Sequence, residues 1–370
     1  MKRIGVDAHV LTGKFQGSRT YLLNILRQVG RIDTTNHYLI YSFDPAVTRV
    51  LLPFDNFEHL RLAMHAPVPR LLFYWPWEQW RRRLDLLLTQ YISPLLYSGR
   101  QIVIVHDLLF ETHPQYFTRL SGLRFRTLVR LSATRARAVL ALSQTTRREI
   151  VSRYRIAEQR VHLVSGGIDP EQHGVDPARA PPFTLMPYVL AVGRLEPRKN
   201  IGTLLRAFRL MRMPGVQLVV IGKEDFRAAD IAVALRAMQG EAGVTWLTEV
   251  SDADLPYYYR HAAVFAFPTF AEGFGLPVLE ALAHGIPVVT SDHPALREAG
   301  GTLADYFPAD AADADRLLAA LLDRAIADGP RWSAADRDAH LAKHSWVRSA
   351  HAMVAAINGT HSPATSRAEA

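Results

Sequence analysis

The sequence predicts an α/β protein built from two Rossmann-like domains, and three observations support this prediction. The chain has 370 residues, 49% of them hydrophobic and 21% charged, which suits about two globular domains. Short apolar runs alternate with helical patterns along the chain, which favours parallel sheets covered by helices on both faces. A stretch rich in Pro and Ala, residues 174–187, interrupts the alternation, and the pattern then begins again.

The expected strands are short runs rich in Val, Ile, Leu and Tyr, each bounded by polar or turn-forming residues. In order they are 2–8, 37–43, 59–65, 84–90, 101–107, 138–143, 161–165, 188–193, 216–222, 244–248, 264–268 and 287–291. A serine-capped amphipathic helix is expected at 345–357. The expected organisation is an N-terminal domain at 1–180, a C-terminal domain at 181–344, the helix at 345–357, and a disordered tail at 358–370.

Composition excludes several classes of protein and leaves others open. The chain has no cysteine, so it has no disulfide framework, thiolate metal site or cysteine nucleophile, and we expect it in the cytoplasm. It lacks the 18 or more uninterrupted apolar residues of a membrane-spanning helix. Its net charge of +8 indicates an anionic partner, which can be nucleic acid, an acidic membrane face or a phosphorylated substrate.

A glycine-rich loop between a strand and a helix carries two carboxylates, Glu272 and Glu280. Pro277 suits the first helical residue, so the amides of residues 273–275 are expected at a helix N-terminus, where an anion or a sugar hydroxyl binds well. One carboxylate precedes the loop and the other follows it, so both can accept hydrogen bonds from the vicinal diols of one ligand. The alternative is an ordinary turn with both glutamates in solvent.

Two other segments place ionisable side chains at the ends of predicted strands. Arg194 and Lys199 follow the strand at 188–193, where two cations can neutralise a diphosphate without a metal. Basic loop residues in a basic protein are the alternative. His106 and Asp107 end the strand at 101–107, at the sheet edge where open α/β proteins bind ligands. There the imidazole can hydrogen-bond to a sugar hydroxyl, or it can simply cap the strand.

These segments resemble the retaining glycosyltransferases of family 4. The Glu-x7-Glu element of that family, with EGFGLP inside it, is matched without a gap from Glu272 to Glu280. Its G-R-x-x-x-x-K-N element is matched from Gly193 to Asn200. The resemblance implies a GT-B fold, in which two Rossmann-like domains with parallel sheets face a central cleft. It also implies that the helix at 345–357 crosses back to an acceptor-binding N-terminal domain.

The resemblance assigns roles to the matched residues. Glu280 is expected to hold the ribose of the donor, and Glu272 to hold the transferred hexose. Arg194 and Lys199 are expected to hold the diphosphate and to stabilise its departure. His106 is expected to reach the transferred sugar, while Asp107 orients rather than reacts.

The first βα loop of the family closes over the diphosphate, and here it reads Gln-Gly-Ser-Arg-Thr-Tyr instead of the usual adjacent glycines. Gly17 stands just before Ser18, a suitable helix cap, and Gly17 and Arg19 are the candidates in this loop. The expected catalytic residues are therefore His106, Glu272, Arg194 and Lys199. The expected donor-binding residues are Gly17, Arg194, Lys199, Glu272, Gly273, Phe274, Gly275, Leu276 and Glu280.

No metal site and no cofactor are expected. Asp252 and Asp254 resemble the Asp-x-Asp metal motif of other sugar transferases, but Ser251 and Asp254 suit a capping box that opens the helix containing residues 257–259. Three further acidic residues suit the first turns of a helix: Asp310, Asp313 and Asp315.

Four arginines lie within about 40° of one another on a helical wheel, and they are candidates for contact with an anionic membrane surface. They are Arg119, Arg126, Arg130 and Arg137. The alternative is a solvated helix face partly paired with acids.

The function implied by the resemblance is transfer of a hexosyl group from a nucleoside-diphosphate sugar, without a metal and with retention. GDP-mannose is the favoured donor, because the motifs look most like those of bacterial polysaccharide and lipopolysaccharide mannosyltransferases. The acceptor is a glycan or a lipid-linked saccharide, at the inner face of the plasma membrane. One alternative is a non-hydrolysing epimerase of nucleotide sugars. The other is a nucleic-acid-binding protein, although no recognised reader motif is present.

Overall fold

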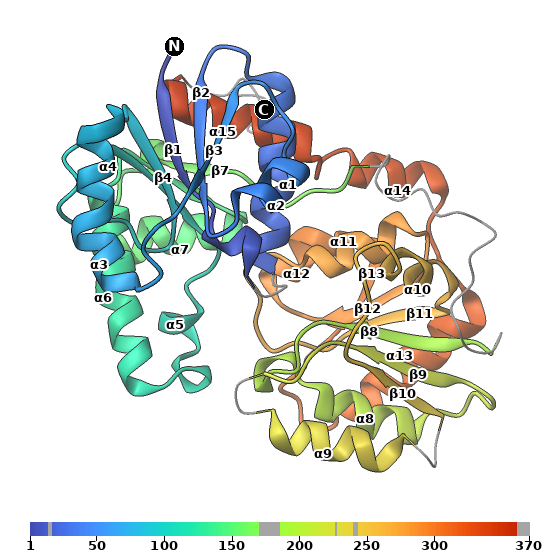
Figure 1. Ribbon diagram of the computed structural model, residues 1–370. Helices are drawn as coiled ribbons and strands as arrows, with labels where there is room; N and C mark the ends of the chain where they lie inside the picture. Colours follow the sequence, from blue (N-terminus) through green and yellow to red (C-terminus); the bar gives the residue numbers. More distant parts are fainter. Residues whose placement is uncertain (14–16, 170–185, 226–227, 240–242, 361–370) are drawn as a thin grey trace. The chain divides into compact units, whose positions relative to one another are not determined.

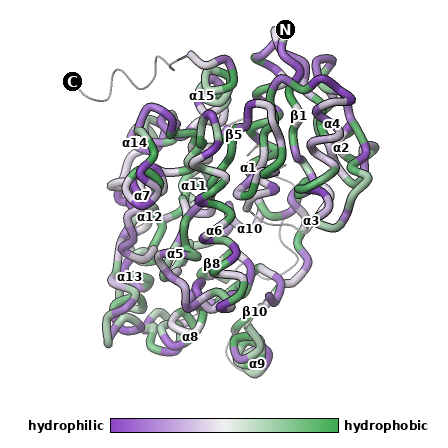
Figure 2. The backbone as a smooth tube through the Cα atoms, turned by 90° about the vertical axis from the view of Figure 1, so that its left-hand side faces the viewer, coloured by the Kyte–Doolittle hydropathy of each residue, from purple (hydrophilic) through white to green (hydrophobic). Residues whose placement is uncertain are grey.

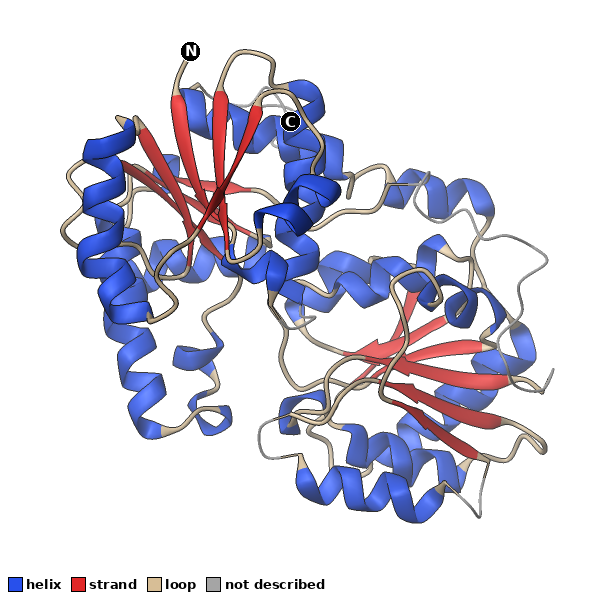
Figure 3. Ribbon diagram, viewed as in Figure 1, coloured by secondary structure: helices blue, strands red, loops and turns tan. Residues whose placement is uncertain are grey.

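The computed structural model describes residues 1–13, 17–169, 186–225, 228–239 and 243–360 (Figure 1). The chain divides into two compact units, here called the first unit (Met1–Gly166 with Ser345–Ala370) and the second unit (Gly167–His344). Each unit has a parallel sheet with helices packed on both faces (Figure 3). The prediction of two Rossmann-like domains with parallel sheets is therefore confirmed. The boundary expected after residue 180 falls within residues 170–185, outside the described residues.

In the described part of the first unit, seven strands pair in the order β3-β2-β1-β4-β5-β6-β7, all parallel. The order reverses between β1 and β4, which is the place where open parallel sheets bind ligands. The side chains of the five inner strands are mostly buried, as expected when helices cover both faces, whereas those of the edge strands β3 and β7 are mostly only partly buried. The strands are β1 (Arg3–Asp7), β2 (His37–Ser42), β3 (Phe57–Arg61), β4 (Leu86–Gln90), β5 (Arg100–Val105), β6 (Ala138–Ala141) and β7 (Val161–Leu163).

The helix α15 joins the first unit although it follows the whole of the second unit in sequence. It packs against α1 and β7, and its Trp346 lies edge-on to Tyr21 of α1 with ring centroids 5.7 Å apart. The Lys2 ammonium donates to the Ile357 carbonyl at 2.9 Å. The helices of this unit are η1 (His9–Thr12), α1 (Gly17–Ile32), α2 (Pro45–Leu51), α3 (Pro67–Pro69), the π-helical turn η2 (Arg70–Tyr74), α4 (Trp75–Arg82), α5 (Leu109–Thr112), η3 (Pro114–Tyr116), α6 (Arg119–Arg135), α7 (Gln144–Tyr154), η4 (Glu158–Arg160) and α15 (Trp346–Asn358).

In the described part of the second unit, six parallel strands pair in the order β10-β9-β8-β11-β12-β13, with the reversal between β8 and β11. The sequence prediction missed β13, because this short edge strand carries an aspartate and is only partly buried. The strands are β8 (Tyr188–Val192), β9 (Gln217–Ile221), β10 (Val244–Leu247), β11 (Val264–Phe267), β12 (Val288–Ser291) and β13 (Ala304–Phe307).

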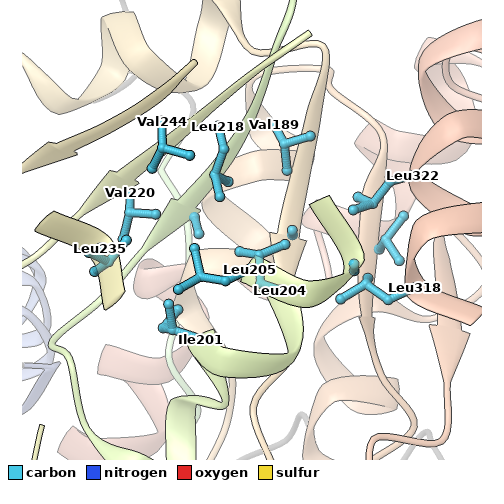
Figure 4. Packing of buried hydrophobic residues seen from close by; sticks show 14 of the residues in the cluster. Val189, Ile201, Leu204, Leu205, Leu218, Val220, Leu235, Val244, Leu318 and Leu322 are labelled. Atoms are coloured by element: carbon cyan, nitrogen blue, oxygen red, sulfur yellow. The ribbon is translucent and has the colours of Figure 1, made fainter. Parts of the chain in front are cut away.

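The core of the second unit forms between its sheet and the helices α8, α9 and α13. Figure 4 shows Leu204 and Leu205 of α8 against Val189 and Leu218 of the sheet, with Leu318 of α13 at one side. The helices are η6 (Pro197–Lys199), α8 (Ile201–Leu210), α9 (Ala229–Met238), α10 (Leu255–His261), α11 (Leu276–Ala283), α12 (Pro294–Gly300), α13 (Ala314–Asp328) and α14 (Ala334–Leu341).

Several predicted boundaries differ from the structure. The strand expected at 59–65 lies at Phe57–Arg61, where each residue is in register with a residue of β2. Ser345 caps α15 through the Val347 amide as expected, but the helix continues to Asn358 and Gly359 ends it in a left-handed conformation, so the expected tail begins too early. Residues 361–370 of that tail lie outside the described residues.

Hydropathy follows the same architecture: Figure 2 shows hydrophobic colour along strands such as β5 and mainly hydrophilic colour along α7. In the described part of the chain, no helix combines the length and the apolar character needed to cross a bilayer.

Candidate functional site

Two loops of the second unit meet at the reversal point of its sheet. The loop after β8 carries Arg198, and the loop after β11 carries Thr269 and Phe270. The carbonyl of Arg198 accepts from the Phe270 amide at 2.8 Å and from the Thr269 hydroxyl at 2.9 Å. These bonds fix the two loops together, so the matched elements at 193–200 and 272–280 form one local site.

Glu272 lies at the centre of this site. Its Oε1 accepts from Lys199 Nζ at 2.5 Å, from Arg198 Nη1 at 2.7 Å and from the Thr269 hydroxyl at 3.2 Å. Burial opposes ionisation of this carboxyl, but the two cations outweigh it and hold the pKa of Glu272 at about 2. Burial lowers the pKa of Lys199, and the neighbouring Glu272 counteracts part of that effect. Lys199 also lies 4.6 Å from the centroid of the Phe267 ring.

The other carboxylate oxygen of Glu272 remains open. Within the described ranges, every hydrogen bond to this side chain goes to Oε1, and Oε2 has no partner. Gly275 is the N-cap of α11, so the turn after Glu272 presents a helix N-terminus beside an ionised, anchored carboxylate. The conformation of Gly275 is left-handed, with φ of 111°, and a Cβ there would lie 2.8 Å from Leu296 Cδ2. Pro277 is the second helical residue rather than the first.

Glu280 faces a partner that the sequence did not indicate. The hydroxyl of Tyr259, on α10, donates to Glu280 Oε2 at 2.8 Å. Burial raises the pKa of Glu280, and the Tyr259 hydrogen bond lowers it in part. Burial also raises the pKa of Tyr259, so the phenol keeps its proton and acts as a donor. The ring of His284 stacks on Tyr259, with centroids 5.5 Å apart and an interplanar angle of 6°.

Arg194 does not join Lys199 directly. Its guanidinium pairs with Asp225, and Nη1 lies 4.0 Å from Glu196 Oε1. Glu196 in turn accepts from Arg198 Nε at 2.7 Å. Three cations and three carboxylates therefore alternate across the site, so each of these cations already has a carboxylate partner. Gly193 lies close to Lys199: a Cβ added at Gly193 would be 3.6 Å from Lys199 Cε.

His106 lies in the first unit, at the carboxyl end of β5. It is buried, and its Nε2 lies 2.6 Å from Gln90 Oε1 at the end of β4. Burial lowers the pKa of His106 to about 3, so the imidazole is neutral near pH 7. Asp107 accepts from the Tyr91 hydroxyl and from the Leu109 amide, both at 3.1 Å. Tyr91 in turn lies against His106, with ring centroids 5.3 Å apart.

The first βα loop differs from the expectation. Residues 14–16 lie outside the described residues, and α1 begins at Gly17, so Ser18 lies inside the helix and is not its cap. Arg19 is buried, and its Nε donates to the Leu11 carbonyl at 3.2 Å. Gly17 is exposed and a Cβ there would meet no atom within 4 Å.

Three of the four candidate arginines are exposed on one helix, and the fourth lies outside that helix. Arg119, Arg126 and Arg130 are exposed on α6. Arg137 lies beyond the end of that helix at Arg135, because Ala136 is extended and the Arg137 amide donates to the Gln101 carbonyl at 2.8 Å. Arg137 is partly buried, and its Nη1 is buried without a hydrogen bond in the described residues.

The Ser251 and Asp254 pair forms a turn before α10 rather than the predicted cap, whereas Asp313 and Asp315 lie at the start of α13 as expected. The Ser251 hydroxyl donates to Asp254 Oδ2 at 2.6 Å and accepts from the Asp254 amide at 3.1 Å. The helix α10, however, begins only after Asp254. The predicted capping box is thus a turn that precedes the helix. Asp313 is the N-cap of α13 without a side-chain cap bond, and Asp315 lies in the first turn.

Each unit matches a family model. Residues 2–172 match the model described as Glycosyltransferase Family 4, and residues 179–338 match the model described as Glycosyl transferases group 1. The chain belongs to glycosyltransferase family 4. The matched elements at 193–200 and 272–280 both lie within the second of these models, on the two loops that the Arg198 carbonyl joins.

Two curated relatives match parts of the chain. The O-antigen chain mannosyltransferase B of Escherichia coli is 37% identical over 163 residues, which are 43% of this chain and 42% of that protein. The O-antigen chain mannosyltransferase RfbU of Salmonella typhimurium is 28% identical over 210 residues, 57% of this chain and 56% of that protein. The chain thus spans about half the length of these relatives.

Solved structures of low sequence identity support the GT-B fold. Sucrose-phosphate synthase of Thermosynechococcus elongatus superimposes with a TM-score of 0.74 at 19% identity, covering 97% of this chain and 99% of that one. HepE of Anabaena, solved in complex with UDP-glucose, gives a TM-score of 0.71 at 18% identity, covering 97% and 100%.

Sequence reasoning missed three residues of this candidate site: Arg198, Asp225 and Tyr259. Arg198 lies inside a quoted motif, and its position between Glu196 and Lys199 was the available signal. Asp225 and Tyr259 are distant in sequence from their partners, and no local pattern connects them.

Proposed function

We propose that the chain is a glycosyltransferase that moves a hexosyl group from a nucleoside-diphosphate sugar to a saccharide or lipid-linked saccharide, in the synthesis of a surface polysaccharide. The observation that carries the proposal is Glu272, whose ionised carboxylate is anchored through Oε1 and open at Oε2 beside the N-terminus of α11. An anchored carboxylate can accept hydrogen bonds from sugar hydroxyls without moving. The epimerase and nucleic-acid alternatives are not retained, because both family models describe glycosyltransferases.

The proposed chemistry needs no metal. Arg194, Arg198 and Lys199 supply positive charge where the diphosphate leaves, and the helix N-terminus adds further stabilisation. Glu280 accepts from the ribose hydroxyls while Tyr259 holds its carboxylate. His106 is neutral and contributes by hydrogen bonding rather than by charge. Retention of configuration is part of the proposal and follows the family resemblance.

We propose mannose as the sugar and GDP-mannose as the donor. Support comes from the two O-antigen mannosyltransferases to which the chain is similar. We further propose a cytoplasmic location against an anionic membrane surface, supported by the exposed arginines Arg119, Arg126 and Arg130 of α6. Charge reversal of these arginines should release the protein from acidic vesicles.

A panel of nucleotide sugars tests the donor site. Thermal unfolding is followed with GDP-mannose, UDP-glucose and the free nucleotides, for the wild type, Glu280→Ala and Glu272→Gln. A ligand at 100 times its Kd stabilises the folded state by about 2.7 kcal/mol, which shifts the midpoint by several degrees. The proposal fails if no nucleotide sugar raises the midpoint, or if Glu280→Ala responds as the wild type does. Product analysis by NMR, which gives the anomeric configuration, then tests transfer and retention.

A further inference from the structure

A row of large aromatic side chains lies exposed on the first unit, on elements that carry none of the candidate donor-site residues. Phe73, Trp77 and Trp80 are 65%, 48% and 80% exposed, and we call these three the aromatic row. Val68, on the preceding α3, is 62% exposed. Soluble surfaces tolerate single exposed apolar residues, but several large ones together mark a surface that contacts something else.

The packing of α4 fixes which of its faces points outward. Trp75 is fully buried against Tyr41 of β2, with ring centroids 5.0 Å apart. Glu78 is buried as well, where it accepts from the Tyr41 hydroxyl at 2.7 Å and from Arg81 Nη2 at 2.9 Å. Because these inner contacts occupy one side of the helix, the aromatic row at positions i, i+4 and i+7 is held on the other side. In Figure 1, α3 and α4 lie along one margin of the first unit.

A π-helical turn leads into α4 and helps to set this arrangement. The amide of Trp75 donates to the carbonyl of Arg70, a wider turn than that of an α-helix. Pro76 follows at once and has no amide hydrogen, so it needs no acceptor one turn earlier. Phe73, in this π-helical turn, is exposed, whereas Trp75, the first residue of α4, is buried.

Within residues 67–83 the exposed charges are all positive, and the exposed Asp85 follows just after this segment. Residues 67–83 contain four arginines and one acid, Glu78, and that acid is buried and paired. Arg81 and Arg83 are exposed at the end of α4. The guanidinium of Arg81 lies 4.6 Å from the centroid of the Trp77 ring, so charge and aromatic surface form one patch.

We propose that the aromatic row, with Arg81 and Arg83, docks on the surface of a bilayer that contains anionic phospholipids. Tryptophan favours the boundary between headgroups and acyl chains, and exposed arginines pair with lipid phosphates. The alternative is a protein partner with an acidic face. Three large aromatic residues close together suit insertion into the headgroup region of a bilayer better than contact with a polar protein surface. This surface lies on η2 and α4 rather than on α6, and it does not depend on the identity of the sugar donor.

Vesicle binding of the full chain tests the proposal. Sedimentation is compared between vesicles of phosphatidylcholine with phosphatidylglycerol and vesicles of phosphatidylcholine alone, for the wild type, Trp77→Ala/Trp80→Ala and Arg83→Gln. Val50→Ser, which changes another exposed apolar residue of the first unit (81% exposed), is the matched control. We expect binding to acidic vesicles that falls about tenfold or more in the double variant. We expect a smaller, salt-dependent loss in Arg83→Gln and no change in Val50→Ser.

Quenching by brominated acyl chains gives a second measurement. Four tryptophans remain in the double variant. Trp75, Trp246 and Trp346 are buried, and Trp332 is partly buried in the second unit, so quenching of tryptophan fluorescence should be strong in the wild type and much weaker in the double variant. The proposal is overturned if the double variant binds and quenches like the wild type. It is equally overturned if binding does not depend on anionic lipid, or if the aromatic row instead supports self-association that the double variant abolishes. An unchanged thermal unfolding midpoint shows that the variants keep the wild-type fold. The vesicle measurements do not depend on the result of the donor-site test.

Discussion

The phenolic oxygen of Tyr259 lies 2.8 Å from Oε2 of Glu280 and donates its proton to that carboxylate. The two residues come from different helices, α10 and α11, and both are removed from solvent enough that burial shifts their pKa values upward. A buried carboxylate with one fixed donor keeps one orientation, so its remaining lone pairs point in fixed directions. Tyr259 is therefore a positioning residue for Glu280.

Tyr259→Phe should weaken donor binding while preserving the fold, since only a hydroxyl is removed. A hydrogen bond to a charged group contributes about 1.5–3 kcal/mol, which corresponds to a rise of about tenfold or more in the KM for the donor. The pKa of Glu280 should rise further, because the bond that lowers it is lost. The acidic limb of the pH profile of kcat/KM should then move to higher pH. An unchanged limb and unchanged KM would argue against the positioning role.

Lys199→Met should destabilise the second unit. Glu272 has a depressed pKa, so its contribution to stability is present above the ordinary value of 4.5 and is lost as pH falls toward 2. Removing one of its two cations raises that pKa, so acid unfolding should begin at higher pH, and about 2 kcal/mol should be lost near neutral pH. Lys223→Met is the control, because its pair with Glu249 is exposed and should contribute less than about 1 kcal/mol. Urea unfolding at several pH values measures both.

Gly275→Ala should be destabilising and should impair donor binding. The left-handed φ of 111° and the 2.8 Å approach to Leu296 Cδ2 both penalise a Cβ, at a combined cost of about 2–4 kcal/mol. Gly202→Ala in α8 is the matched control, since the nearest atom to its Cβ is 3.6 Å away and helical alanine is favoured over glycine. Thermal unfolding of the two variants should change in opposite directions, and equal changes would contradict the geometry.

His106→Gln should make stability less dependent on pH between about 4 and 6.5. The pKa of His106 is lowered from 6.5 to about 3, so in this range the unfolded chain binds a proton that the folded chain does not. Stability from this residue is therefore complete above pH 6.5 and falls with decreasing pH, by up to about 1.4 kcal/mol per unit. Urea unfolding of wild type and variant at pH 7 and pH 5 tests this prediction. If the free energies of unfolding of the wild type and the variant differ by the same amount at pH 7 and pH 5, the folded chain binds a proton at His106 as readily as the unfolded chain does. That result would contradict the lowered pKa.

The sequence predicted the sheets and the centre of the site, because these depend on local patterns. Buried parallel strands are continuous apolar runs, and the loop from Glu272 to Glu280 has glycines and a proline at defined positions. Tyr259 could not be found in this way, since it reads as one more core aromatic and its partner lies on another helix. Arg137 was misplaced because a helical wheel continues past Arg135, whereas the chain turns into β6 at Ala136. The edge strand β13 lacks the apolar run that marked the others.

The packing of α15 against α1 gives the two units different routes to completion during synthesis. The second unit is one continuous segment, so all of its strands can pair as soon as that segment has left the ribosome. The first unit is interrupted, and the ring of Tyr21 in α1 receives its Trp346 neighbour only after the whole second unit has been made. Until then an apolar face of α1 stays uncovered, so the half that is translated first is the half that is finished last.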